Sequence, residues 1–201
     1  MKALMALILL LLPLAAMAEP YPALHDVTGV AGDDVLNVRA GPSSSTEIIG
    51  AFGPFQRDIE VIALNAAGTW GLVNVAEGSG WASMRFLARQ PGQDWGNLPI
   101  ALECSGTEPF WSLSVRADGT VRLDRLGELD FYITRARIPA SGRPDRFAIR
   151  ADNDAGEITP ILAYAACSDG MSDRSFGLTV DFIRRSAGDE TLYSGCCSLA
   201  P

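Results

Sequence analysis

Apolar and polar residues alternate with a period of two along most of this chain, and this feature most constrains its fold. In "FWSLSVRADGTVRLDRL", Leu113 and Val115 alternate with polar neighbours, and Val121 and Leu123 do so again after Asp118-Gly119. Such alternation is typical of a half-buried strand, and Asp-Gly is a favoured turn between antiparallel strands. The stretch therefore predicts a β-hairpin.

Further strands are predicted on both sides of this hairpin. Before it lie the alternating stretches "DDVLNVR" and "DIEVIAL" and a second hairpin in "GTWGLVNVAEGSGWASMRFL", turning at Glu77-Gly78-Ser79. After it come "FYITRARI", "RFAIRA", "ITPILAYAAC", "GLTVDFIRR" and "TLYSGCC", separated by turn-forming stretches such as "SGRPD" and "ADNDAGE". We predict an all-β protein whose second half is a meander, a sandwich or a closed antiparallel barrel of seven or eight strands.

The first 18 residues have the pattern of a signal peptide. Lys2 supplies a positive start, residues 3–14 are apolar but too few to span a bilayer, and Ala16-Met17-Ala18 fits a signal-peptidase site. An uncleaved anchor is the alternative. No cysteine follows the cut for lipid attachment. We expect a protein secreted across the inner membrane and located in the periplasm.

Composition divides the rest of the chain into two small domains. The stretch "RQPGQDWGNLP" interrupts the strand pattern with Pro, Gly and Gln, so we predict a linker at 90–97 between domains at 19–89 and 98–201. Trp95 is expected to pack against one domain and fix the angle between them, with ligand stacking as the alternative.

Charge and histidine content restrict the possible functions. Lys2 is the only lysine, so without the leader 15 arginines face 24 acidic residues, a net charge of −9. Phosphate backbones and anionic membranes would repel such a chain, which excludes nucleic acid as a partner. His25 is the only histidine and is expected to be solvent-exposed, so a Ser-His-Asp triad or a histidine zinc site in the core is excluded.

Carboxylates are the remaining candidates for catalysis or metal binding. Glu108, Asp169 and Asp173 are possible acid–base groups, but nothing in the sequence brings them together. "DNDAGE" begins like a calcium loop, yet its glycine is one place early and its twelfth position is Ala163, which favours a simple hairpin turn. We therefore predict no enzyme activity, no cofactor and no metal.

All four cysteines lie in the second half of the chain. In an exported protein, disulfides are the expected state. A bond between Cys196 and Cys197 would join Cα atoms only about 3.8 Å apart, below the usual disulfide range, and neighbours on a strand face opposite ways. Each is therefore expected to pair with Cys104 or Cys167, and the residues alone leave both pairings open.

Three motifs in the first half, "DVLNVRAGPSSSTEIIG", "TWGLVNV" and "GWASMRFL", resemble the bacterial SH3 (SH3b) domain. The resemblance covers residues 24–88 and implies a five-stranded SH3-like barrel that binds peptides, notably those of bacterial cell walls. Asn37, Arg39, Trp70 and Trp81 are the candidate ligand-binding residues. The alternatives are an ion pair of Arg39 with Asp33 or Asp34 and a core position for Trp81.

The second half resembles an uncharacterised family of exported bacterial domains. The motifs are G-x-E-P-F-W in "CSGTEPFWSL" and C-x-D-x-M-S-D followed by G-C in "CSDGMSDRSFGLTV" and "SGCC". The resemblance implies disulfides Cys167–Cys196 and Cys104–Cys197, which makes "CSDGMSD" a stapled turn. Phe110 and Trp111 should face opposite ways, and we take Glu108 with Trp111 as surface candidates, a plug over the barrel end being the alternative.

Two functions follow as hypotheses. The first is a non-catalytic envelope protein whose first domain binds cell-wall peptide. The second is a disulfide-bonded binder or inhibitor of an envelope enzyme, acting through the second domain. A scaffold within a larger assembly is a third possibility.

Overall fold

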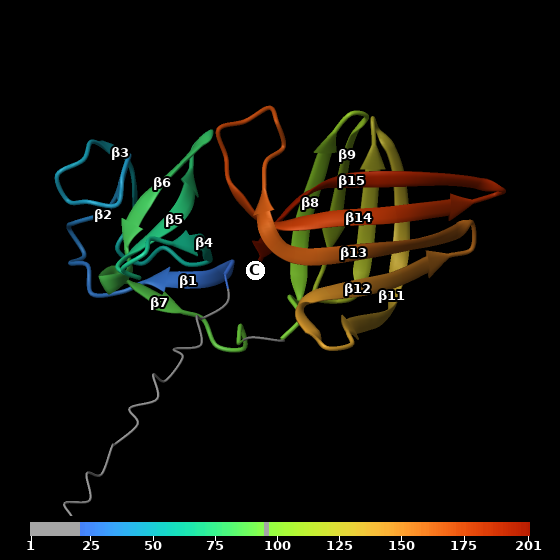
Figure 1. The fold of residues 1–201 in the computed structure, drawn as a ribbon, viewed down its shortest axis with the longest axis horizontal. Coiled ribbons are helices and arrows are strands. Elements are labelled where there is room, and N and C mark those ends of the chain that lie inside the picture. The colour runs from blue at the N-terminus through green and yellow to red at the C-terminus, as the bar shows by residue number, and fades with distance from the viewer. Residues whose placement is uncertain (1–20, 95–96) are drawn as a thin grey trace, which may run out of the picture.

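The computed structural model of this chain describes residues 21–94 and 97–201 and is built of strands, with one short 3-10 helix at Met84–Phe86 (Figure 1). This confirms the predicted all-β class. The predicted signal peptide, the uncleaved-anchor alternative and the role of Trp95 all fall on residues outside the described part. Among the described residues, no helix is long and apolar enough to cross a membrane.

The N-terminal sheet consists of seven antiparallel strands in the order β3-β2-β6-β5-β4-β1-β7. Their bounds are β1 Ala23–Val27, β2 Leu36–Arg39, β3 Ile48–Phe52, β4 Ile59–Leu64, β5 Trp70–Val75, β6 Gly78–Ser83 and β7 Leu87–Arg89. Val38, Val61, Val73 and Ala82 are fully buried at the centre of its core. The SH3b resemblance implied five strands in a barrel, whereas this sheet has seven and is open. Its last strand, β7, is three residues long, which leaves few backbone groups for a further partner.

The turn of the hairpin β5–β6 begins one residue earlier than predicted and is one residue shorter. The turn is at Ala76-Glu77, and Ala76 adopts a positive φ of 50°. Gly78 and Ser79 therefore belong to β6, where Gly78 pairs with Val75. This shift places Ser79 on a strand that faces the second half of the molecule.

His25 is buried, and the prediction that it is solvent-exposed was wrong. It lies on β1, between β4 and β7, and only 1% of its surface is exposed. Its Nδ1 is 2.9 Å from the carbonyl oxygen of Ala23, and because a carbonyl only accepts, Nδ1 carries the hydrogen. Its ring stacks on that of Tyr21 at 6.0 Å.

The C-terminal barrel is closed and contains eight antiparallel strands in the order β10-β11-β12-β13-β14-β15-β8-β9. Their bounds are β8 Ala101–Thr107, β9 Phe110–Val115, β10 Thr120–Arg125, β11 Glu128–Ala140, β12 Arg143–Asn153, β13 Gly156–Cys167, β14 Phe176–Ser186 and β15 Asp189–Ala200. The predicted hairpin is confirmed as β9–β10, with Gly119 at a φ of 89° in its turn. "DNDAGE" is the predicted turn between β12 and β13.

Trp111 is part of the barrel core, so its assignment to the surface was wrong. Only 5% of its surface is exposed, and its ring meets Phe182 at 5.0 Å and Tyr193 at 6.0 Å. It has the same strand parity as Leu113, so it faces inward, and Phe110, 53% exposed, is the outward ring.

Two glycines make room for the Trp111 ring inside the barrel. Gly106 lies opposite Trp111 on β8, and Gly195 lies nearby on β15. A Cβ atom at either position would collide with the indole ring. The backbone can therefore approach the ring closely only because both residues are glycine.

The two disulfides are Cys104–Cys197 and Cys167–Cys196, the pairing that the second resemblance implies. Cys104 and Cys197 face each other across β8 and β15, with Cα atoms 3.9 Å apart, and both are buried in the core. Cys196, on the opposite side of β15, bonds Cys167 at the end of β13. Cys167 is only partly buried. The adjacent residues Cys196 and Cys197 thus form disulfides on opposite faces of β15.

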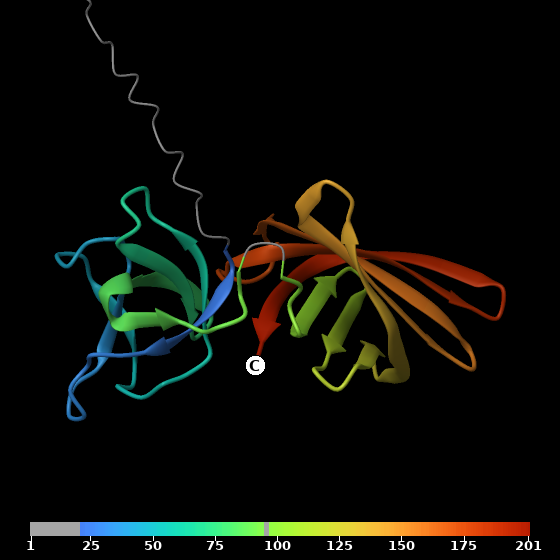
Figure 2. The same cartoon turned by 90° about the horizontal axis from the view of Figure 1, so that it is seen from below.

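The two β parts lie side by side, and the end of β15 is placed between them (Figure 2). Gly177 on β14 packs against the ring of Pro22, where a Cβ atom would come within 2.6 Å of the proline Cδ. The barrel therefore contacts the residue that directly precedes β1.

Candidate binding groove and domain contact

Three of the four predicted ligand-binding residues line one groove on the N-terminal sheet. Asn37, Arg39 and Trp70 border it together with Phe86, and its volume is about 530 Å³. The remaining lining residues are Leu36 at the start of β2, Ser44, Ser83, and five residues of the β1–β2 loop: Gly29, Val30, Ala31, Asp34 and Val35. Residues from four separate segments of sequence thus meet at one concave surface.

Strand register explains why these side chains meet. Val38 is buried and pairs with Ala82, so its neighbours Asn37 and Arg39 point to the outer face of β2. Trp70 pairs with Ser83 on the same face, two strands away. The outer face of β2, β6 and β5 therefore collects them.

Trp81 shares this face without lining the groove. It pairs with Arg39 on β2 and with Leu72 on β5, and it is half-buried between them. Its neighbours Gly80 and Ala82 face the core instead.

The groove carries both charge signs. Arg39 Nη1 donates to the carbonyl of Thr46 at 2.6 Å, and none of the ion pairs within residues 21–94 and 97–201 joins it to Asp33 or Asp34. Asp34 also lines the groove, and its Oδ1 accepts from the Val35 amide at 2.7 Å. With the rings of Trp70 and Phe86, the groove offers aromatic, cationic, anionic and amide contacts.

The segment "CSDGMSDRS" is a stapled loop between β13 and β14. Asp169 Oδ1 accepts from the amides of Met171 and Ser172, both at 3.0 Å, and its Oδ2 accepts from the Ser172 hydroxyl at 2.8 Å. These hydrogen bonds hold the pKa of Asp169 below its usual value. Asp169 is therefore occupied in shaping the loop.

The stapled loop, residues 168–175, reaches from the barrel to the β5–β6 hairpin of the N-terminal sheet (Figure 1). Asn74 and Ser175 exchange two hydrogen bonds, and the Ser79 hydroxyl lies 3.1 Å from the carbonyl oxygen of Asp173. Asp173 also pairs with Gly78 in an isolated parallel bridge. Sequence reasoning missed this contact, because it joins residues about 100 positions apart.

Glu60 makes a second contact between the two parts. It lies on β4, and its Oε1 accepts from the amide of Leu199 on β15 at 2.8 Å. Burial raises the pKa of Glu60 to about 7, although the Leu199 amide and the positive charge of Arg174 oppose the rise. The contact therefore contains a carboxyl group that titrates near neutral pH.

The structure places the three carboxylates considered for catalysis in a turn and in the stapled loop. Glu108 is exposed in the β8–β9 turn, Asp169 shapes its loop, and Asp173 contacts Gly78. Within residues 21–94 and 97–201, no three His, Cys, Asp or Glu side chains are grouped so that they could hold a metal ion.

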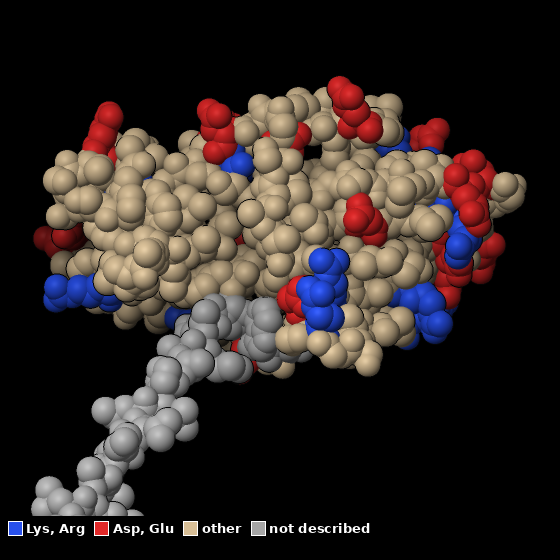
Figure 3. Space-filling view, in the orientation of Figure 1, with Lys and Arg blue, Asp and Glu red and all other residues tan. Residues whose placement is uncertain are grey.

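Charged side chains are sparse over much of the face in Figure 3 and gather toward the far end of the barrel. That end contains the β12–β13 and β14–β15 turns, where Arg185 bonds Glu157 at 2.8 Å and Glu190 at 2.6 Å. These ion pairs are exposed and are expected to contribute little to stability.

Comparisons of the chain with models of protein families, with curated proteins and with solved structures find no match. The SH3b resemblance therefore rests on the three sequence motifs alone. The groove and the contact between the sheet and the barrel do not depend on this resemblance, because they follow from the geometry of this chain.

Proposed function

We propose that this protein is a non-catalytic binding protein of the cell envelope, whose N-terminal sheet binds a cell-wall peptide in the groove. One observation carries the proposal: Asn37, Arg39 and Trp70, which the SH3b motifs single out, line the same groove. An extracytoplasmic location is supported by the two disulfides, which persist mainly in oxidising compartments.

The chemistry of the groove suits a peptide. Trp70 and Phe86 provide aromatic faces for apolar portions of a ligand, while Arg39 and Asp34 can bind a carboxylate and an amine. Cell-wall stem peptides contain both charged groups. Because the chain as a whole is acidic, long-range attraction to an anionic wall is absent, so we expect affinity in the micromolar range or weaker.

Sedimentation with purified peptidoglycan sacculi tests the proposal. The full chain, with both disulfides formed, should sediment with the sacculi, and Trp70→Ala should remove most of the binding. Phe131→Ala is the matched control, because Phe131 is an aromatic residue on the barrel, 55% exposed and outside the groove. Failure of the unaltered chain to sediment, or equal binding by Trp70→Ala, would contradict the proposal.

The second candidate function is a protein binder acting through the C-terminal barrel. Leu129, Phe131 and Ile133 alternate along β11, and each is about half exposed, so they form an apolar stripe on the outside of the barrel. Exposed apolar stripes of this kind favour protein partners. A protein partner bound here should be lost by Phe131→Ala and retained by Trp70→Ala. Binding to the cell wall should show the opposite pattern.

A further inference from the structure

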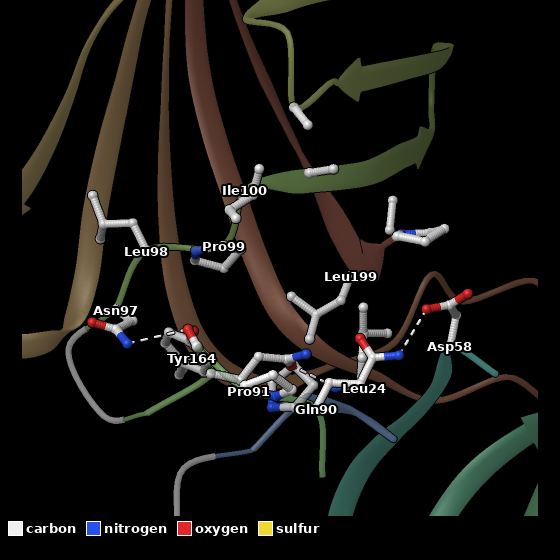
Figure 4. Close-up of a pocket in the computed structure, with 17 residues that line it drawn as sticks. Leu24, Asp58, Gln90, Pro91, Asn97, Leu98, Pro99, Ile100, Tyr164 and Leu199 are labelled. Carbon is white, nitrogen blue, oxygen red and sulfur yellow. Dashed lines mark hydrogen bonds between the residues drawn. The ribbon is translucent and has the colours of Figure 1, made fainter. Parts of the chain in front are cut away.

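A second cavity lies where the N-terminal sheet and the barrel meet (Figure 4). Its volume is about 330 Å³. Leu24 on β1 and Asp58 come from the sheet, and Tyr164 on β13 and Leu199 on β15 come from the barrel. The chain between β7 and β8 contributes Gln90, Pro91, Gly92, Gln93, Asn97, Leu98, Pro99 and Ile100. The remaining lining residues are Pro22, Ala101, Ala117, Ala200 and Pro201.

The walls of this interdomain pocket are mostly apolar. Leu98, Tyr164 and Leu199 pack on one side against the barrel core, and in Figure 4 Leu199 lies amid the lining residues. Leu24 and Ile100 add aliphatic surface. An apolar molecule placed here would therefore exchange water for hydrocarbon contacts on several sides.

Apart from Asp58, the side chains of the pocket are uncharged, and its three amide side chains already form hydrogen bonds within the protein. Gln90 Nε2 donates to Asp26 at 2.7 Å and to Asp58 at 2.8 Å. Gln93 Oε1 accepts from the Leu24 amide at 2.6 Å, and Asn97 Nδ2 donates to the Gly92 carbonyl at 3.1 Å. The only charged side chain among the described lining residues is thus Asp58, which Gln90 binds.

We propose that the interdomain pocket binds a small, uncharged molecule with an apolar body about the size of two fused aromatic rings. A cavity of roughly 150 Å³ accepts one benzene, and this pocket has about twice that volume. An ionic ligand would lose its hydration without gaining a partner of opposite charge, except at Asp58. The ligand class follows from this combination of size, apolar walls and neutral amides.

A ligand in this pocket touches both parts of the molecule. It can therefore bind fully only when the sheet and the barrel are in contact, and by linkage it stabilises that arrangement. The site is separate from the peptide groove, since the two share no lining residue. Loss of one activity should leave the other in place.

N-phenyl-1-naphthylamine is a suitable probe, because it is uncharged, has a naphthalene body and becomes fluorescent in apolar surroundings. Titrated into the full chain with both disulfides formed, it should show saturable binding of one molecule per chain. Ile100→Trp should weaken binding at least tenfold, because Ile100 lines the pocket, is 68% exposed and has room for a larger side chain that fills the space.

Ile161→Trp is the matched control. Ile161 is 53% exposed on the outer face of β13 and is not among the pocket residues, so this change adds the same ring elsewhere and should leave probe binding unchanged. Trp70→Ala should also bind the probe normally. Circular dichroism shows whether each variant is folded. If Ile100→Trp does not fold, Ala117→Trp replaces it, because Ala117 also lines the pocket and lies in the exposed β9–β10 turn.

Two results would overturn the proposal. The first is absence of saturable binding to the unaltered chain. The second is equal binding by the pocket variants and by Ile161→Trp, which would place the probe on the exposed apolar surface of the barrel.

Discussion

Asn74 and Ser175 lie 101 residues apart and exchange two hydrogen bonds across the contact between the sheet and the barrel. Asn74 Nδ2 donates to the Ser175 carbonyl at 2.9 Å, and the Ser175 amide donates to Asn74 Oδ1 at 3.0 Å. The side chain of Asn74 thus satisfies both the amide and the carbonyl of Ser175, as the backbone of a paired strand would. It fixes the stapled loop to the N-terminal sheet.

Asn74→Ala is expected to release the stapled loop. It removes both hydrogen bonds from half-buried groups, a loss of about 1–3 kcal/mol for the contact. Amide hydrogen exchange of residues 168–175 should accelerate.

Asn65→Ala is the matched control for this experiment. Asn65 Oδ1 accepts from the amides of Thr69 and Trp70 inside the N-terminal sheet, so its loss should lower stability without affecting the loop. Unchanged loop exchange in Asn74→Ala would show that the contact does not hold the loop.

Glu60 predicts a pH dependence of stability. Its folded-state pKa of about 7 lies above the value of 4.5 expected in the unfolded chain, because burial penalises the carboxylate. The folded state therefore binds more protons between these values. The contribution of Glu60 to the free energy of unfolding is therefore fully present below pH 4.5 and is lost as the pH rises to about 7.

Glu60→Gln stays uncharged and keeps an oxygen that accepts from the Leu199 amide. The variant should lose this pH dependence and should be more stable than the unaltered chain above pH 7. Thermal unfolding at several pH values between 4.5 and 8 measures the effect. If the melting temperatures of the two proteins changed with pH in parallel, Glu60 would not be the source of the pH dependence.

The two disulfides should differ in both accessibility and energetic weight. Cys167–Cys196 closes a loop of 29 residues and Cys104–Cys197 one of 93. In the chain-entropy model these closures contribute roughly 3.5 and 4.5 kcal/mol. Removing the Cys104–Cys197 bond should therefore cost more in guanidinium unfolding.

Exposure predicts the order of reduction. Cys167 is partly exposed, whereas Cys104 and Cys197 are buried. Under mild reductant, alkylation followed by mass spectrometry should label Cys167 and Cys196 first. Earlier labelling of Cys104 would contradict the packing described for this core.

Gly106→Ala should destabilise the barrel by about 1–3 kcal/mol, because its Cβ would press on the Trp111 ring. The near-ultraviolet circular dichroism of Trp111 should change with it. Gly53→Ala is the control, since nothing lies within 4 Å of the added Cβ atom and its φ is not positive. Equal stability of the two variants would argue against the close approach.

Much of the fold is predictable from alternation. The β9–β10 hairpin follows from alternating Leu113 and Val115 with an Asp-Gly turn, because such patterns depend only on neighbouring residues. The inward position of Trp111 was also available from that parity. The alternation of Phe110 and Trp111 alone does not say which ring faces the core, whereas counting from Leu113 does.

Other features depend on residues far apart in sequence. The burial of His25 requires that β1 lie between β4 and β7, and the closure of the barrel requires that β8 meet β15. The raised pKa of Glu60 depends on β15 covering β4. No local pattern records these pairings, so they appear only once the whole chain is folded.

The most direct test of the proposed function is a titration of 15N-labelled protein with a soluble muramyl peptide, followed by NMR. The account predicts that the indole N–H of Trp70 and the signals of Asn37 and Arg39 shift together and saturate, while the buried indole of Trp111 does not move. Absence of shifts, or shifts confined to the barrel, would contradict peptide binding in the groove.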